Sequence, residues 1–484
     1  MNTTLHVGTV IDTVATADPA RVALVMDGDT ISYGALATAV DRCAAALSAY
    51  GVLAGQRVPI VDVASLPAIA TVLAAARIGA AAALMNPALT PPELRALLQD
   101  GGYAALAIAG EPYADRLAEA GVTRVLTGAE LLSDNHPPMI PVAAEDDREA
   151  LVLFTSGTTG LPKTVGITDR KLDMRITRTS PPFQVDVPPS VVMMCVPYFH
   201  IGGCVMLFGS FHSGNTLVVQ KRFDAGEWLR LVSRHRIKSM FLVPTMLHRI
   251  LDHPDFASAD LSSLTAFTYG AAAAPGALVR RAMAALPHVA FTNVFGQTET
   301  VGTYASLGPE DHHDPARAGS VGRPAPGVEV RVVDADTGED VESGAVGEIL
   351  VRTTQNVADG WFATGDLVRI DADGYIYPVG RLKDTINRGG EKFGPIEIEE
   401  ALRSHPALHD VAVAGVADDE IGQRVGVAVV TTAPVTLEEL RWHCRESLAY
   451  FKLPERLKVV DAIPYNATGK VNRIRLAALI AEGG

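Results

Sequence analysis

A short apolar run enters a loop rich in hydroxyl groups at residues 151–163, which read LVLFTSGTTGLPK. The run Leu151 to Phe154 has the composition of a buried strand, and the loop after it carries four hydroxyl side chains, two glycines and Lys163. Glycines let backbone amides approach an anion, hydroxyl groups donate to phosphate oxygens, and a lysine adds positive charge. The stretch therefore predicts a strand followed by a phosphate-binding loop, although a polar surface loop after a buried strand has the same general composition.

The loop is close to the P-loop motif but departs from it at one position. Gly157 and Lys163 have the required spacing, whereas Pro162 stands where the motif needs a glycine and has no backbone N–H to donate. We therefore expect a different kind of phosphate loop. Its candidate binding residues are Thr155, Ser156, Gly157, Thr158, Thr159, Gly160 and Lys163.

The rest of the composition is that of a large globular protein. Of the 484 residues, 48% are hydrophobic and 20% charged, which excludes a disordered chain. The formal net charge of −14 argues against a nucleic-acid partner, which favours a basic surface. Any anionic ligand must then meet positive charge that is concentrated at specific sites.

The cysteines and the N-terminus indicate a cytoplasmic location. The four cysteines show no CxxC spacing, so neither a zinc site nor a redox pair is expected. No basic segment precedes an apolar run near the N-terminus, as a signal peptide would require. The most membrane-like stretch, Ala68 to Met85, is rich in alanine and interrupted by Arg77 and Gly79, so we expect a buried helix followed by a short strand and no transmembrane segment.

Helices and strands alternate along most of the chain. Helices are expected at 33–50, 92–100, 396–404 and 437–448, and strands at 58–63, 150–154, 191–196, 239–243, 290–294, 347–351, 411–416 and 424–430. The alternation extends to about residue 380, and Asp371 to Gly374 reads as a hairpin turn. We therefore predict an α/β fold with a large N-terminal domain of layered α/β subdomains at 1–382 and a small α+β domain at 383–484.

The loop at 155–163 resembles the phosphate-loop signature of the adenylate-forming superfamily, which comprises acyl-CoA synthetases, stand-alone adenylation domains and beetle luciferases. Further motifs of that superfamily follow in order over nearly the whole chain. They are PYFHIGG at 197–203, YGAAAAP at 269–275, FGQTE at 295–299, TGD at 364–366, GRLKD at 380–384, GG at 389–390, EIE at 397–399 and NATGK at 466–470.

The resemblance implies that the protein uses ATP, Mg²⁺ and coenzyme A. Joining a carboxylate to a nucleotide that carries about four negative charges requires cations and aligned donors. Glu299 is the implied Mg²⁺ ligand, with Thr298 on the α-phosphate and Phe295 stacked on adenine. Asp366 would accept from the ribose hydroxyls, and Arg381 would contact ribose or phosphate oxygens. The implied adenine and acyl-pocket walls also include Gly270, Ala271, Ala272 and Gly296.

The C-terminal motifs imply a small domain that moves. Lys470 would reach the carboxylate and the α-phosphate during adenylation, and the catalytic residues implied are Lys470, Glu299 and Lys163. Lys383 corresponds to the superfamily's hinge, where torsion changes turn the small domain between two half-reactions. Gly390 would then face the incoming thiol.

His200 is implied to line or gate the acyl pocket, although a core histidine is the alternative. Amino-acid-activating relatives carry an aspartate in this motif, and its absence here disfavours an amino-acid substrate. Small residues such as Ala305 fit a medium aliphatic, aryl or polycyclic acid, and no basic residue of these motifs favours a dicarboxylate.

The implied activity is that of an acid–thiol ligase, an AMP-forming acyl-CoA synthetase acting on a carboxylic acid, ATP and CoA. Two alternatives remain open. One is an acyl-AMP ligase that delivers the acyl group to an acyl carrier protein. The other is a homologue that binds nucleotide or acyl ligands without catalysis, which the presence of every expected cation and carboxylate argues against.

Overall fold

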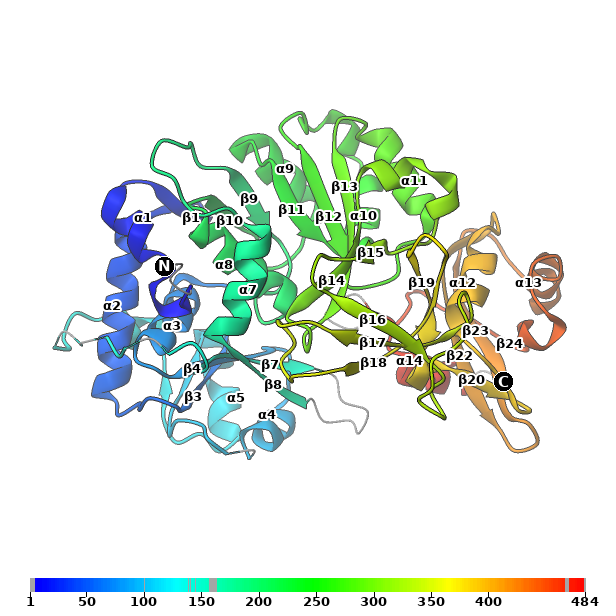
Figure 1. The fold of residues 1–484 in the computed structure, drawn as a ribbon, viewed down its shortest axis with the longest axis horizontal. Coiled ribbons are helices and arrows are strands. Elements are labelled where there is room, and N and C mark those ends of the chain that lie inside the picture. Colours follow the sequence, from blue (N-terminus) through cyan, green and yellow to red (C-terminus); the bar gives the residue numbers. More distant parts are fainter. Residues whose placement is uncertain are drawn as a thin grey trace.

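The computed structural model describes residues 5–99, 101–137, 139, 141–143, 145–155, 163–465 and 470–482. Its strands form four sheets, which Figure 1 shows as two large sheets, a smaller one beside them and a separate C-terminal unit. Residues 156–160 of the predicted phosphate loop and 466–469 of the last motif lie outside the described residues.

The first large sheet has six strands and carries the start of the phosphate loop. Its strands are parallel except for β8, which runs antiparallel to β7. In spatial order they are β6 (Val125–Leu126), β5 (Ala107–Ala109), β3 (Arg57–Val61), β4 (Ala81–Met85), β7 (Glu149–Thr155) and β8 (Lys163–Thr168). The predicted strand at 150–154 is therefore confirmed, and the hairpin β7–β8 holds Thr155 opposite Lys163.

The second large sheet has nine strands. Two of them come from the start of the chain, at residues 22–32, and the other seven from residues 191–324. In spatial order they are β15 (Arg323–Pro324), β14 (Gly302–Leu307), β13 (Ala290–Gln297), β12 (Ala266–Gly270), β11 (Ser239–Leu242), β9 (Val191–Met194), β10 (Thr216–Val219), β1 (Val22–Met26) and β2 (Asp29–Ser32). The six central strands, β13, β12, β11, β9, β10 and β1, are parallel to one another, as expected for alternating helices and strands. The edge strands are antiparallel: β2 pairs with β1 at one edge, and β14 and β15 follow β13 at the other.

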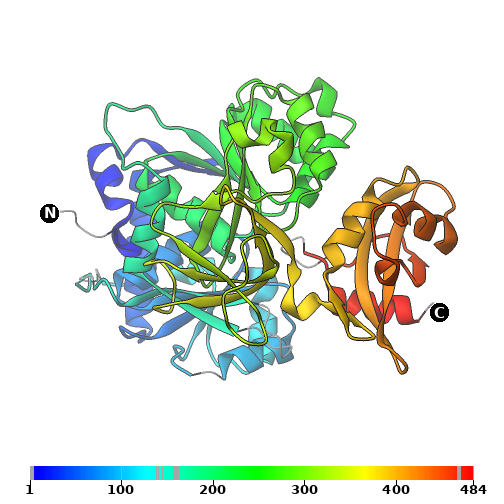
Figure 2. The ribbon, with the colours of Figure 1, turned by 45° about the vertical axis from the view of Figure 1, so that its right-hand side comes forward.

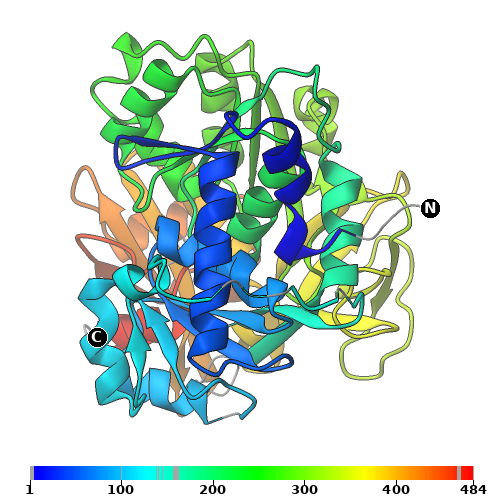
Figure 3. The ribbon, with the colours of Figure 1, turned by 90° about the vertical axis from the view of Figure 1, so that its left-hand side faces the viewer.

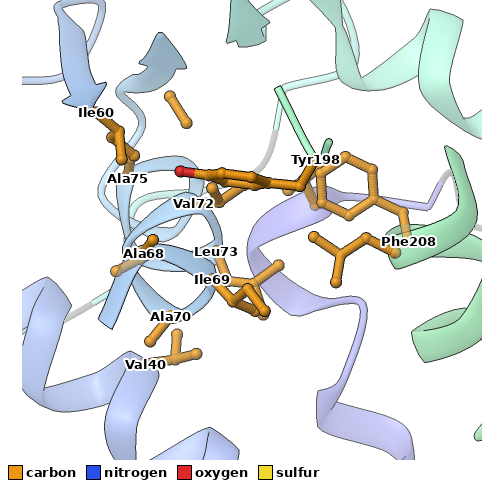
Figure 4. Close-up of a cluster of buried hydrophobic side chains, with 14 of the residues drawn as sticks. Val40, Ile60, Ala68, Ile69, Ala70, Val72, Leu73, Ala75, Tyr198 and Phe208 are labelled. Atoms are coloured by element: carbon orange, nitrogen blue, oxygen red, sulfur yellow. The ribbon is translucent and has the colours of Figure 1, made fainter. Parts of the chain in front are cut away.

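Helices pack around and between these sheets (Figures 1 and 3). They are α1 (Asp12–Ala17), α2 (Tyr33–Ala49), α3 (Leu66–Arg77), α4 (Pro91–Leu98), α5 (Ala114–Glu119), α6 (Gly128–Leu131), α7 (Asp169–Thr179), α8 (Ile201–His212), α9 (Ala225–His235), α10 (Pro244–Leu251) and α11 (Gly276–Ala285). One hydrophobic cluster joins residues of both large sheets to α2, α3, α7 and α8. Helix α3 is rich in alanine, and Ala68, Ala70 and Ala75 belong to the cluster of buried side chains that Figure 4 shows.

The prediction that helices and strands alternate to residue 380 is wrong beyond α11. Between α11 and residue 394 the structure has strands and short 3₁₀ turns, including a four-stranded antiparallel sheet of β16 (Glu329–Val333), β17 (Gly347–Arg352), β18 (Phe362–Ile370) and β19 (Ile376–Arg381). A short apolar run has the same composition in a parallel and in an antiparallel strand, so the run itself does not show whether a helix or a turn follows it. The predicted turn at 371–374 is confirmed between β18 and β19, where Asp371 Oδ1 accepts from the backbone N–H groups of Asp373 and Tyr375.

The C-terminal residues form a unit with its own core, seen to one side of the large sheets in Figure 2. Its strands are β20 (Ile386–Arg388), β21 (Glu391–Phe393), β22 (Leu408–Asp418), β23 (Gly422–Thr431) and β24 (Arg456–Val459). Its helices are α12 (Pro395–Arg403), α13 (Leu437–Cys444) and α14 (Arg473–Ala481). A 3₁₀ turn at Leu382–Asp384 connects β19 of the four-stranded sheet to β20 of this unit.

The alanine-rich stretch forms a helix and a strand, as predicted. Helix α3 ends at Arg77, and among the described residues no helix is both long and apolar enough to cross a bilayer. Arg77 is buried, and its guanidinium donates to Asp12, to Asp41 at 2.5 Å and to the carbonyl of Gly8 at 2.9 Å. One side chain thus ties α3 to the two preceding helices and to the N-terminal turn.

Replacing Arg77 by methionine should lower the free energy of unfolding by about 3 kcal/mol, because two carboxylates lose their shared partner and a backbone acceptor is orphaned. Urea denaturation measures the change. Arg42→Met is the control, since Arg42 is exposed and lies 4.0 Å from Asp134. It should cost less than about 1 kcal/mol. Equal losses in the two variants would contradict the structural role of Arg77.

Candidate active site

A cavity of about 1010 Å³ lies where the β7–β8 hairpin, the β13–β14 edge, the four-stranded sheet and the C-terminal unit meet. This volume suffices for a nucleotide together with an organic acid. Ten of the residues singled out from the sequence line it. They are Thr155, Lys163, His200, Ala271, Gly296, Thr298, Glu299, Arg381, Lys383 and Lys470.

Five other candidates do not line this cavity, namely Gly270, Ala272, Phe295, Asp366 and Gly390. The Phe295 ring packs edge-on against Tyr304, with ring centroids 5.3 Å apart, in a cluster beside the four-stranded sheet. At Gly270 a Cβ atom would lie 2.2 Å from the carbonyl oxygen of Val294, so close strand packing already requires glycine there. The adenine and acyl-pocket contacts of Gly270, Ala272 and Phe295 stay predictions.

Glu299 lies in a tight turn between β13 and β14, not at the start of a helix. Its Oε1 accepts from the Thr155 hydroxyl at 3.1 Å, which brings the first residue of the phosphate loop to the candidate metal ligand. The turn then needs positive φ at Val301 (47°) and Gly302 (92°). Mg²⁺ is commonly held by one or two protein oxygens, with water and phosphate completing its shell, so Glu299 beside a hydroxyl fits such an ion.

Asp366 and Arg381 are opposite partners on β18 and β19. The Arg381 Nε donates to Asp366 Oδ1 at 2.5 Å, and Gln297 Nε2 donates to Asp366 Oδ2 at 2.7 Å. Asp366 is 7% exposed, and each of its oxygens keeps one further lone pair for another donor. Gln297, a residue of the FGQTE motif to which no role was assigned from the sequence, therefore belongs to this group because it orients the carboxylate.

Lys470 reaches the cavity from the C-terminal unit. Burial in the cleft lowers the pKa of its ammonium, with nearby Arg381 as the next cause, while Asp366 and Glu299 oppose the shift. The residue itself keeps accessible surface, so water and ligands can reach it within the cavity. The structure thus holds Lys470 in the charge environment of Glu299, Asp366 and Arg381, although it lies 171 residues beyond Glu299 in the sequence.

His200 directly precedes the first residue of α8 and lines the cavity, whereas Tyr198 points into the core (Figure 4). Burial and then the Lys470 ammonium lower the pKa of His200 from 6.5 to about 4. Its Nε2 is buried without a hydrogen-bond partner. The imidazole is therefore neutral near pH 7 and offers a polar atom to a ligand in the cavity.

Two glycines of the C-terminal unit occupy a hairpin turn. Gly389 and Gly390 connect β20 to β21 with φ values of 59° and 95°, the conformation that a two-residue hairpin turn demands. A Cβ atom at Gly390 would meet no heavy atom within 4 Å. The turn alone accounts for the glycine, and its place in a thiol channel stays a prediction.

The structure adds a cation to the cavity that no motif identified. Arg175 lies on α7 and lines the cavity, and its residue is 9% exposed. The sequence offers no periodic or spacing signal for it, because a single arginine on a polar helix is usually a surface residue.

Comparison with known proteins places this site in a family. AMP-binding enzymes match residues 11–362, and the C-terminal domain of AMP-binding enzymes matches residues 397–470. The chain belongs to this adenylate-forming superfamily. Within it the chain stands close to the acyl-CoA synthetases, a class of ATP-dependent ligases.

Individual relatives cover the chain almost completely. An indoleacetate–CoA ligase from Aromatoleum aromaticum is 32% identical over 98% of both chains. A fatty acid–[acyl-carrier-protein] ligase, ScoC, from Streptomyces coeruleorubidus is 31% identical over 95% of this chain and 93% of its own. The structure of o-succinylbenzoate coenzyme A synthetase from Bacillus subtilis with ATP and magnesium superposes with a TM-score of 0.86 at 27% identity, covering 97% of this chain and 99% of that one. ATP and Mg²⁺ use is thus supported for the family.

The depressed pKa of His200 predicts a pH dependence of stability. The unfolded state gains a proton near pH 6.5 and the folded state only near pH 4, so unfolding binds protons between these values and stability falls as pH falls through that window. At pH 5 the contribution lost is about 2 kcal/mol.

Urea denaturation of the parent protein and of His200→Gln at pH 7 and pH 5 tests this expectation. The parent should lose about 2 kcal/mol more than the variant on acidification. The same loss in both proteins would show that His200 titrates normally.

Proposed function

We propose that this protein is an AMP-forming acyl-CoA synthetase that activates a carboxylic acid with ATP and transfers the acyl group to coenzyme A. The observation that carries the proposal is the position of Lys470 on the same cavity as Glu299 and Lys163. Three groups from distant parts of the chain supply the two cations and the carboxylate that acyl-adenylate formation needs.

In the first half-reaction a carboxylate oxygen attacks the α-phosphorus and pyrophosphate leaves. Lys163 and Lys470 reduce the repulsion between the two anions, and the neutral His200 borders the acid without adding charge. Glu299, with the Thr155 hydroxyl beside it, is the group that would hold Mg²⁺. That ion supplies charge compensation for the phosphates when bound.

In the second half-reaction a thiol sulfur attacks the acyl carbon and AMP leaves. Rotation of the small domain about Lys383 would withdraw Lys470 and open a path for the thiol. The short connection between β19 and β20 supports this role, because it consists only of the 3₁₀ turn at Leu382–Asp384 and Thr385. We place the boundary between the domains there, at residues 382 and 383.

The identity of the acceptor thiol has a second candidate. The fatty acid–[acyl-carrier-protein] ligase among the relatives favours a carrier-protein phosphopantetheine as the alternative to CoA. The two acceptors have the same reactive end, so the distinction rests on surface contacts outside the cavity.

Replacing Lys470 by alanine should slow acyl-adenylate formation at least 100-fold, since a cation is removed from the reacting charges. Transfer from supplied acyl-AMP to CoA should change less than about threefold, because that step no longer needs Lys470. Pyrophosphate release and thioester formation measure the two steps separately. Lys458→Ala, on β24 and away from the cavity, is the control. Equal losses in both half-reactions would contradict the proposal that Lys470 serves acyl-adenylate formation and not transfer to the thiol.

A pyrophosphate-release panel of acids of graded length and aromaticity tests the activity itself. We expect acid-dependent pyrophosphate release, followed by AMP release when CoA is added. Release of AMP with a phosphopantetheinylated carrier protein and not with CoA would establish the alternative acceptor. No pyrophosphate with any acid would overturn the proposal in favour of a non-catalytic homologue.

A further inference from the structure

Arg175 is a charged side chain on the cavity wall, and no described residue acts as its counter-ion. Among the described residues its guanidinium makes one hydrogen bond, from Nη2 to the Thr303 hydroxyl at 3.2 Å, and its buried Nε has no partner there. The charged neighbour that affects it in this part of the chain is another arginine, Arg178, and not a carboxylate. A guanidinium offers five N–H donors, so most of its hydrogen-bonding capacity is unused.

Such an arrangement is costly for a purely structural residue. Burying a cation without a carboxylate partner destabilises the folded state by several kcal/mol. Arg178, one helical turn further along α7, increases the cost because it brings a second positive charge. Burial, together with Arg178, lowers the pKa of Arg175 to about 10, which still leaves it protonated near pH 7.

Arg175 comes from a helix that contributes none of the motif residues. The other cations on the cavity are Lys163, Arg381, Lys383 and Lys470. Those residues belong to the phosphate-loop hairpin, the ribose motif, the hinge and the C-terminal unit. Arg175 instead comes from α7, beside the first turn of α8 and the start of β14.

The immediate surroundings of Arg175 leave room for a ligand. Gly302 lines the cavity beside Arg175, and a Cβ atom there would lie 3.2 Å from the Arg175 Nε and 3.7 Å from Ile201, so a side chain at this position would crowd the guanidinium. The cavity lining also includes hydroxyl and apolar residues from the end of α7, the residue after it, and α8, namely Thr179, Ser180, Met206, Gly209 and Ser210.

We infer that Arg175 binds a second anionic oxygen group of the acid, a carboxylate or a sulfonate distinct from the carboxylate that is activated. The inference rests on the proposed function and narrows its substrate class to acids with two anionic groups. A planar fork of donors matches an oxyanion in a bidentate manner, and the ligand then supplies the counter-ion that the protein omits. It also revises the expectation from the motifs, which contained no basic residue for a dicarboxylate.

Arg175 has one competing role, in which it contacts the reacting carboxylate itself. In that case every acid would depend on it equally. If it binds a second group, only acids that carry that group would depend on it. The comparison of matched acids in one variant therefore separates the two roles.

The experiment measures kcat/KM for pyrophosphate release with pairs of acids that differ only in the second group. Linear dicarboxylic acids and aryl diacids are paired with the monoacids of the same carbon skeleton, and sulfonated acids replace the dicarboxylic acids in a separate arm. The parent protein should prefer the diacid by at least tenfold. Arg175→Met should lose about 10- to 100-fold with diacids, as expected for charge-assisted hydrogen bonds, and keep or improve its rate with monoacids.

Two further variants control the interpretation. Arg178→Met removes the neighbouring positive charge. The Arg178 side chain donates to Gln355 at 2.5 Å and does not line the cavity, so this variant should preserve the preference for diacids. Arg175→Lys keeps the charge without the planar fork, and it should show an intermediate preference. It also provides the test if the methionine variant does not fold.

Three results would overturn the inference. They are a preference of the parent protein for monoacids, an equal loss with both members of every pair in Arg175→Met, and an unchanged preference in that variant. Activity with any acid in these assays would leave the proposed function intact. Absence of pyrophosphate release from all acids, by contrast, would be a failure of the proposed function itself.

Discussion

Electrostatic repulsion between two reacting anions is the constraint on which this structure depends. An overall charge of −14 repels a nucleotide and a carboxylate alike, so the positive charge must be gathered where they meet. The cavity collects Lys163, Arg381, Lys383 and Lys470 against Glu299 and Glu348. The burial that draws these cations together also lowers the pKa of Lys470, and the nearby carboxylates limit that loss.

The strongly patterned parts of the fold could be predicted from the sequence. The helix at 33–50, the alanine-rich helix and strand, and the hairpin at 371–374 follow from periodicity and turn chemistry, and the structure contains all three. The antiparallel sheet of β16 to β19 could not be distinguished from further α/β layers. Strand direction depends on contacts between residues far apart in sequence, and a short apolar run carries no record of them.

The residues of the candidate site also differ in whether the sequence alone could identify them. Motif residues such as Glu299 and Lys470 were recognisable because their neighbours in sequence are unusual, and the structure brings both to one cavity. The motif around Gln297 was recognisable but its role was not, because that role is to donate to Asp366 on another strand. Arg175 lies outside the motifs, and it stands out only after folding, because no described residue supplies it with a carboxylate. Burial without a partner is a property of the folded protein alone.

The segment that connects the four-stranded sheet to the C-terminal unit is short. Only residues 382–385 separate β19 from β20, and four residues span about 13 Å at full extension. A domain on such a tether can turn but cannot leave. If this domain turns as proposed, the tether keeps its lysine near the nucleotide at a high effective concentration, in the millimolar range or above, even while the lysine is withdrawn from the cleft. The change from one proposed half-reaction to the other would then be an intramolecular event whose rate does not depend on protein concentration.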